Sequence, residues 1–373
     1  MKPSARWWAA REPSRITRLL GLAVFAAILF SVPAVFTRID PYTMSDGVQM
    51  AILAIAALGL VPLTGYANQI SLGQAAFYGT GAYTSAILTA HSGWNPWLAL
   101  LVGAVVAGGG AYVLGLFIFR VSGHYLALAT IALGLVLAIV ARQLAVTGGS
   151  EGLPGIPYLT VFGTDLTGDV AYYYFAAAVL LVATMVVGLV VRSSLGRSLT
   201  AVGDSAFAAA ASGIDIARYK RVAFVLAAVL AAVAGSLYAH WVTYVDVHTL
   251  DLLLSIQMLI VVAVGGMRSV WGPAVGAFVV VSLVRFSKEW LPALSEKAGG
   301  QVEIVAYGVA LILVLLFLPR GVVGGIADLF ARVGGSSRPL PAPAPPAAPV
   351  GAGDAASAGS AAGPASVSGR EPS

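Results

Sequence analysis

Long apolar runs, separated by short polar breaks, make up most of this 373-residue chain. A helix that crosses a membrane needs about 20 apolar residues, because the hydrocarbon core is roughly 30 Å thick. We expect such helices at 17–37, 47–64, 73–91, 96–118, 124–142, 170–191, 221–241, 251–267, 271–287 and 302–319. The pattern therefore predicts an all-α polytopic membrane protein with about ten transmembrane helices.

The composition supports this class and removes others. Hydrophobic residues make up 59% of the chain and charged residues 10%, which lies far outside the range of soluble domains. There is no cysteine, so neither a disulfide nor a thiolate metal site can form. The net charge of +5 reflects orientation in the lipid bilayer, and we expect no nucleic-acid partner, no metal and no cofactor.

Basic residues fix the expected topology. With the amino terminus in the cytoplasm, 16 Lys and Arg residues fall on the inside and five on the outside. This bias predicts a multi-pass protein of the plasma (inner) membrane with both termini cytoplasmic. We expect a basic cytoplasmic amino terminus at 1–16, a transmembrane domain at 17–330, and a disordered tail rich in Pro, Ala and Gly at 331–373.

The first apolar run has an alternative interpretation. A basic start followed by an apolar stretch is also typical of a cleaved signal peptide. This run is long, and no clear small-residue cleavage site follows Phe36. We favour a retained span.

A polar interval at 192–221, here called the 192–221 loop, separates two of the apolar runs. Its basic residues place it in the cytoplasm. Its Ala-rich centre predicts a short helix that Asp204 or Ser205 caps and that Gly213 ends in a left-handed conformation, with Asp215 capping the next helix. The alternative is a solvated basic loop that only fixes the topology.

No acidic residue lies near the middle of any predicted span. Proton-coupled and sodium-coupled carriers usually place a carboxylate there, although carbonyls and hydroxyls alone can hold sodium. The energy for transport is therefore expected to come from another subunit.

A Gly-rich stretch at 65–83 predicts a broken helix that lines a translocation path. Irregular backbone at membrane depth persists only where protein or a water-filled cavity satisfies its polar groups. The candidate path residues are Asn68, Gln69, Ser71, Gly73, Gln74, Gly79, Gly81 and Tyr83, joined by His124, Tyr125 and Thr130 at the start of a later span. For the glycines the alternative is close helix packing.

Taken together, four stretches resemble the membrane subunits of ATP-binding-cassette importers for branched-chain amino acids, of the longer M type. They are 65–83, 123–134, 147–157 and 195–224, the last continuing through 265–273, and the resemblance covers about Met50 to Gly321. It implies that the 192–221 loop couples the permease to an ATPase. The family's coupling motif is matched by Gly213, Ile214, Arg218, Tyr219 and Lys220. The full set of candidate coupling residues adds Asp204, Ser205, Phe207 and Ala209. This chain has Ala206 and Ala210 where that family usually has glutamates.

The resemblance also implies partners. They are two cytoplasmic ATP-binding subunits, a second homologous permease subunit and a soluble solute-binding protein. The chain would hydrolyse nothing itself and would admit branched-chain amino acids, or urea and short amides, by alternating access. The competing hypotheses are a stand-alone ion-coupled secondary carrier and a membrane scaffold without transport.

Overall fold

The computed structural model describes residues 21, 23–33, 43–119, 125–161, 163–294, 308 and 321–325. Contacts divide the chain into two units, 1–329 and 330–373, and every described residue belongs to the first. The predicted span at 302–319, apart from Gly308, and the predicted tail at 331–373 lie outside the described residues. Within the predicted span at 17–37, Ala23–Pro33 is helical.

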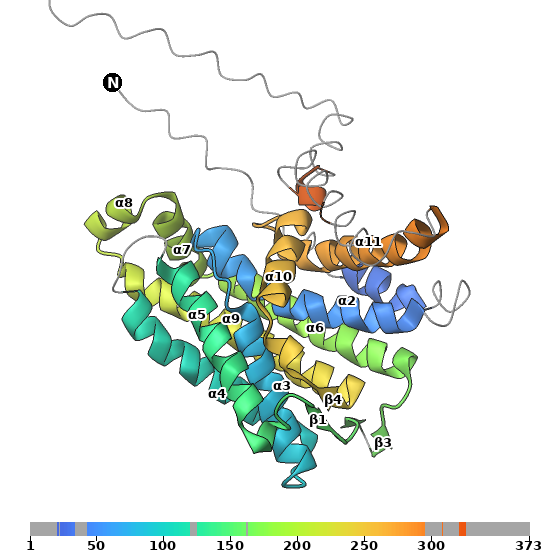
Figure 1. The fold of residues 1–373 in the computed structure, drawn as a ribbon. Helices are drawn as coiled ribbons and strands as arrows, with labels where there is room; N and C mark the ends of the chain where they lie inside the picture. The colour runs from blue at the N-terminus through green and yellow to red at the C-terminus, as the bar shows by residue number, and fades with distance from the viewer. Residues whose placement is uncertain are drawn as a thin grey trace, which may run out of the picture. The chain divides into compact units, whose positions relative to one another are not determined.

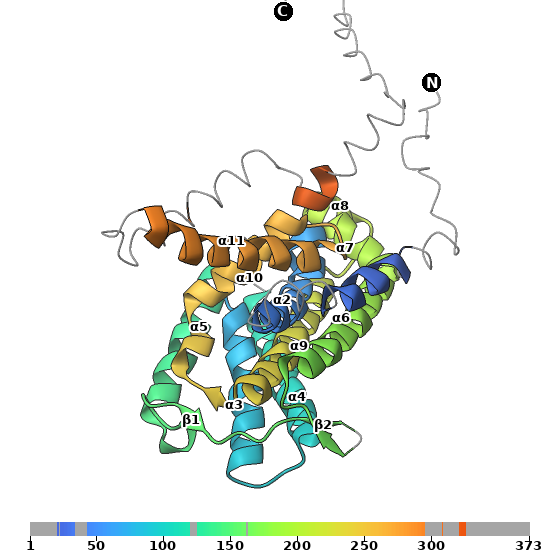
Figure 2. The ribbon, with the colours of Figure 1, turned by 90° about the vertical axis from the view of Figure 1, so that its right-hand side faces the viewer.

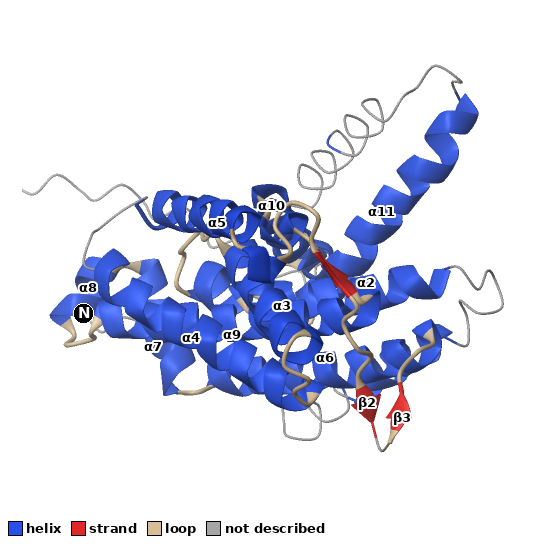
Figure 3. Cartoon of the chain, turned by 60° about the horizontal axis from the view of Figure 1, so that its bottom comes forward, coloured by secondary structure: helices blue, strands red, loops and turns tan. Residues whose placement is uncertain are grey.

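Most of the described residues are helical (Figure 3). The α-helices are α2 (Thr43–Leu58), α3 (Gln74–Ala90), α4 (Pro96–Ile118), α5 (Tyr125–Gln143), α6 (Asp169–Arg192), α7 (Ser194–Asp204), α8 (Ala206–Ala211), α9 (Ile216–Val242), α10 (Leu252–Gly265) and α11 (Gly272–Leu294). Short helical turns are η1 (Val61–Tyr66), η2 (Ala145–Thr147) and η3 (Val247–Leu250). The all-α class predicted from the sequence is confirmed.

Each predicted span between 47 and 287 coincides with one described helix, and α4 has the predicted bounds. Within the described part of the chain, α4, α5, α6 and α9 are long and apolar enough to cross a membrane. Shorter apolar helical stretches are Ala23–Pro33, Met44–Leu58 in α2, Leu252–Gly265 in α10 and Gly272–Phe286 in α11. Among the helix ends, α2 stops six residues before the predicted 64 and α11 continues seven residues beyond the predicted 287. Among the helix starts, the largest difference is at α9, which begins five residues before the predicted 221. Asp215 caps it there, so the helix extends beyond its apolar part.

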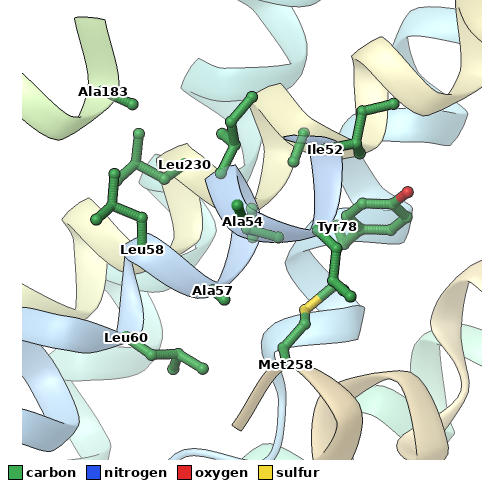
Figure 4. Packing of buried hydrophobic residues seen from close by; sticks show 14 of the residues in the cluster. Ile52, Ala54, Ala57, Leu58, Leu60, Tyr78, Ala183, Leu230 and Met258 are labelled. Carbon is green, nitrogen blue, oxygen red and sulfur yellow. The ribbon is translucent and has the colours of Figure 1, made fainter. Parts of the chain in front are cut away.

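Helix α9 forms the centre of the bundle and packs against α2, α3 and α4 (Figure 1). In the most apolar 18-residue stretch of α9, 67% is buried inside the protein, whereas in that of α5 only 17% is buried. Small residues allow this: a Cβ added at Gly81 of α3 would collide with the Ala232 backbone of α9. In the main hydrophobic core, residues of α2 lie beside Leu230 of α9, Tyr78 of α3 and Met258 of α10 (Figure 4).

The helical path of α2 is broken where the Gly-rich stretch predicted a break. After α2 the chain passes through the π-helical turn η1, in which Pro62 provides no N–H donor. Asn68 then adopts a left-handed conformation with φ of 52°, and non-helical backbone continues to Gly73 before α3 begins. The polar side chains of this region therefore lie at a real interruption between two helices.

Two pairs of very short strands lie at the end of the bundle opposite α8 (Figures 1 and 2). β1 (Leu153–Pro154) pairs antiparallel with β4 (Tyr244–Val245), and β2 (Thr160–Val161) with β3 (Thr164–Asp165). We call this the β1 end of the bundle and the other the α8 end. The 192–221 loop and the strands therefore mark opposite ends of the same set of long helices.

Candidate functional site

The 192–221 loop folds into two short helices instead of the single helix expected. Each helix that starts in this region has a side-chain cap: the Ser193 hydroxyl accepts a hydrogen bond from Leu195 N at 3.1 Å, and Ser205 from Ala208 N at 3.3 Å. At the start of α9 the Asp215 carboxylate accepts one from Arg218 N at 3.0 Å. These caps satisfy N–H groups in the first turns of α7, α8 and α9, which otherwise lack a partner within the helix.

Gly213 ends α8 in the left-handed conformation predicted for it, with φ of 79°. The Ile214 N–H bonds to the Ala209 carbonyl and the Gly213 N–H to the Ala210 carbonyl, each at 3.0 Å. This pair of bonds is the Schellman motif, which needs a positive φ and therefore favours glycine. The sharp turn returns the chain directly into α9.

The structure corrects several details of the predicted loop. Asp204 does not cap α8, because Ser205 does, and Asp204 is instead the last residue of α7. Arg218, Tyr219 and Lys220 belong to the start of α9 and not to a loop. Ala209 is only 3% exposed, so it packs inward and offers no surface to a partner.

The opposite face of α8 is apolar and exposed. The Phe207 side chain is 86% exposed, and Ala206 and Ala210, where the resemblance expects glutamates, are exposed beside it. An exposed phenyl ring on a helix with small neighbours is a surface that a second protein can cover closely.

Arg268, in the connector between α10 and α11, links α7 to the helix break that follows α2. Its Nη2 donates to Asp204 Oδ1 at 3.2 Å and its Nε to the Gly65 carbonyl at 3.0 Å. The Tyr66 hydroxyl donates in return to the Arg268 carbonyl at 3.1 Å. The connector between α10 and α11 thus holds α7 and η1 together, a link that sequence reasoning missed because its members are far apart in the chain.

The amides and hydroxyls at the break have different surroundings. The buried Gln74 amide donates to the carbonyls of Ala56 at 2.9 Å and Ala227 at 3.0 Å, so it joins α2, α3 and α9. The side-chain amide of Gln69 donates to the carbonyls of its neighbours Ala67 and Asn68, and Asn68 is exposed. Ser71 is buried, and its hydroxyl has no hydrogen-bond partner among the described residues.

Thr130 brings α5 to the break. Its hydroxyl accepts a hydrogen bond from Leu72 N at 3.1 Å, and a Cβ added at Gly73 would collide with the Cβ and the carbonyl of Thr130. The close contacts of Gly73 and Gly81 fit the packing alternative for these glycines. His124 lies outside the described residues, and of Tyr125 only the backbone, at the start of α5, is described.

Two cavities flank α3. One of about 150 Å³ lies between α3 and α5 and includes Gly79 and Tyr83 from the predicted path. The other, of about 210 Å³, is lined by polar residues that the sequence did not single out, namely Gln49, Tyr78, Tyr238, Asp246, His248, Thr249 and Gln257, together with Ile52, Leu53 and Leu254. These side chains come from α2, α3, α9, η3 and α10, so no local motif could have revealed them.

His240 holds the β1 end together. Its Nδ1 lies 2.7 Å from the Pro157 carbonyl and its Nε2 lies 2.9 Å from Ser85 Oγ. A carbonyl only accepts, so Nδ1 carries the proton and Nε2 accepts from the serine. The buried imidazole thereby attaches the segment after β1 to both α3 and α9.

Long apolar helices, a helix broken at polar residues and a capped helical loop at one end define an all-helical, multi-pass membrane protein of the permease class. The profile of the family described as "branched-chain amino acid transport system / permease component" matches residues 47–318, and the chain belongs to this family.

Two curated relatives carry the name "high-affinity branched-chain amino acid transport system permease protein LivM". The chain is 26% identical to the one from Salmonella typhimurium (strain LT2) over 340 residues, which cover 84% of this chain and 77% of the relative. It is 27% identical to the one from Escherichia coli (strain K12) over 312 residues, covering 76% and 71%. No solved structure matches the chain at a significant level.

Proposed function

We propose that this chain is the membrane subunit of an ATP-binding-cassette importer that moves branched-chain amino acids, or related small polar solutes, inward by alternating access. Two cytoplasmic ATP-binding subunits supply the energy, a second homologous permease completes the path, and a soluble binding protein delivers the solute. The α8 end faces the cytoplasm, and so do both termini. The names of the two relatives favour branched-chain amino acids over urea or amides.

The exposed apolar face of α8 is the observation that carries this proposal. A water-facing phenyl ring costs free energy unless a partner covers it, and the flanking alanines permit close approach. The caps at Ser193, Ser205 and Asp215 make the loop a rigid lever instead of a flexible tether. Phe207, Ser205, Gly213 and Ile214 form the core of the proposed contact with the ATPase, whereas Ala209 supports it from inside.

A route from this contact to the translocation path runs through Arg268. Movement of α7 is transmitted by Asp204 to Arg268 and from there to Gly65 and the break before α3. The path itself lies beside α3, with Gly79 and Tyr83 on one wall and the break at Asn68 to Gly73 at the α8 end. Alternating access then requires only a shift of α3 and η1 relative to α5.

The test is ATP-driven uptake by the full transporter reconstituted in proteoliposomes, with Gly213→Asp compared with Gly213→Asn. A Cβ at Gly213 meets nothing within 4 Å, so both variants bear the same left-handed strain, and Asn and Asp tolerate it best among side-chain-bearing residues. We expect the aspartate variant to reach the membrane but to lose solute-stimulated ATP hydrolysis and uptake, because a charge enters an apolar contact.

The asparagine variant should retain most of both activities. Unaltered uptake by Gly213→Asp would rule out coupling through this loop, and uptake driven by a proton or sodium gradient without ATP would favour the secondary-carrier hypothesis.

A further inference from the structure

A third cavity, of about 450 Å³, lies at the α8 end between α6, η1 and the connector that joins α10 to α11. It is separate from the two cavities beside α3. Its lining combines two arginines with aromatic and aliphatic side chains: Tyr66, Thr184, Met185, Gly188, Leu189, Val191, Arg192, Arg268, Ser269, Val270 and Trp271. We call it the α6 cavity.

The charged side chains that line the α6 cavity are all positive. Arg192 and Arg268 both line it, and its described lining contains no acidic residue. Arg268 uses Nε for Gly65 and one Nη2 proton for Asp204, which leaves further N–H donors, and the Arg192 guanidinium has no partner among the described residues. Two guanidinium groups and the Ser269 hydroxyl are a donor set suited to a phosphate group.

The apolar part of the cavity continues along α6. Val182, Met185, Val186 and Leu189 are 60%, 45%, 43% and 71% exposed, and their spacing puts them on one face of the helix. This stripe leads away from Arg192 at the last turn of α6. Trp271 lies beside the arginines, where an indole ring favours the boundary between lipid and water, and the Phe25 ring packs against it with centroids 4.7 Å apart.

We propose that the α6 cavity binds an anionic phospholipid, with its phosphate between Arg192 and Arg268 and an acyl chain along the α6 stripe. A soluble phosphate would match the arginines but not the apolar stripe, and a neutral lipid would match the stripe but not the guanidinium of Arg192, which is unpaired among the described residues. The proposal does not depend on the ATPase contact. Because Arg268 also holds Asp204 and Gly65, the bound lipid sits next to the link between the 192–221 loop and the break before α3.

Native mass spectrometry of the purified full chain tests this binding, with phosphatidylglycerol and phosphatidylcholine titrated separately. We expect phosphatidylglycerol to be retained at least fivefold more strongly. Arg192→Gln should weaken its retention about fivefold, and Arg192→Gln with Arg268→Gln by considerably more. The matched control is Arg218→Gln, which removes the same charge at the same end from an exposed side chain of α9 outside the cavity lining. It should retain the lipid as the wild type does.

Because the double variant also loses the Asp204 link, Arg192→Gln alone keeps the test independent of folding. Equal retention of the two lipids, or wild-type retention by Arg192→Gln, would overturn the proposal. Displacement of the lipid by glycerol phosphate at equal affinity would show a soluble-anion site instead and would overturn it as well.

Discussion

Arg268 Nη2 lies 3.2 Å from Asp204 Oδ1, and this ion pair joins the connector between α10 and α11 to the last residue of α7. The two side chains are 57% and 66% exposed, so the pair contributes little to stability, on the order of 0.2–1 kcal/mol. Its position matters more than its strength. Within the described residues, it is the only side-chain hydrogen bond between α7 and the connector that also holds Gly65.

Asp204→Asn removes the charge and keeps the shape. We expect the melting temperature of the permease to stay within about 2 °C of the wild type, because an exposed pair is weak. Solute-stimulated ATP hydrolysis should fall several-fold, since α7 is then held less firmly to the break before α3. Glu151→Gln, an equivalent change at the β1 end, is the control. Full coupling in Asp204→Asn would show that the link carries no signal.

Phe207→Ala tests the exposed face of α8. The ring makes few contacts within the chain, so the stability of the isolated permease should change by less than about 0.5 kcal/mol. The dissociation constant for the ATP-binding subunit should rise at least 10-fold, as for a central aromatic at an interface. The dissociation constant is measured in detergent with the purified subunits. As a control, Phe278→Ala removes a different exposed phenylalanine, on α11, and should leave the affinity unchanged.

Gln74→Leu tests the polar contact in the core. It removes both hydrogen bonds from the Gln74 amide to the carbonyls of Ala56 in α2 and Ala227 in α9, and so breaks the polar link among three helices. Side-chain hydrogen bonds between membrane helices contribute about 0.6 kcal/mol on average, so we expect a loss of about 1–2 kcal/mol in unfolding free energy. Gln69→Leu loses only bonds to its own neighbours and should be nearly neutral. Equal losses in the two variants would contradict this account.

His248, in η3 outside the membrane-spanning helices, has a raised pKa because its ring bonds to the Asp251 carboxylate at 2.9 Å and lies near the negative charge of Asp246. A raised folded-state pKa stabilises the fold below the unfolded value of about 6.5, and this stabilisation is lost as the pH rises through the folded pKa. NMR titration should show the His248 pKa falling markedly in Asp251→Asn and less in Asp246→Asn. The same pKa in all three proteins would refute the assigned cause.

Much of the fold could be predicted from the sequence, because membrane helices must be long and apolar. The bounds of α4 were found from the apolar run that follows Asn95 and Pro96, which cap and start the helix. The start of α9 was missed because its first turn is polar, and the 3.6-residue apolar pattern ends before the helix does. The extra helix α7 was missed for a similar reason, since glycine and serine interrupt it.

The sequence predicted only those features of the candidate site that depend on residues close together in the chain. Gly213 was assigned its left-handed conformation because a helix end followed by a cap demands it. The burial of Ala209 and the hydrogen bond of Asp204 to Arg268 depend on how α8 and α7 pack. A run of alanines does not show which of them will face inward. The polar cavity with Asp246 and Gln257 combines residues from five elements, so only the folded chain brings it together.

The most direct test of the coupling claim uses the absence of cysteine in this chain, which makes Phe207→Cys a unique thiol. In the assembled transporter, a short thiol-to-amine cross-linker at residue 207 should join this chain to the ATP-binding subunit, with a yield that changes between ATP-bound and nucleotide-free states. Glu151→Cys at the β1 end should give no such product. A thiol at 207 that stays free and uncross-linked in an actively transporting complex would contradict the proposal that α8 is where ATP hydrolysis drives this permease.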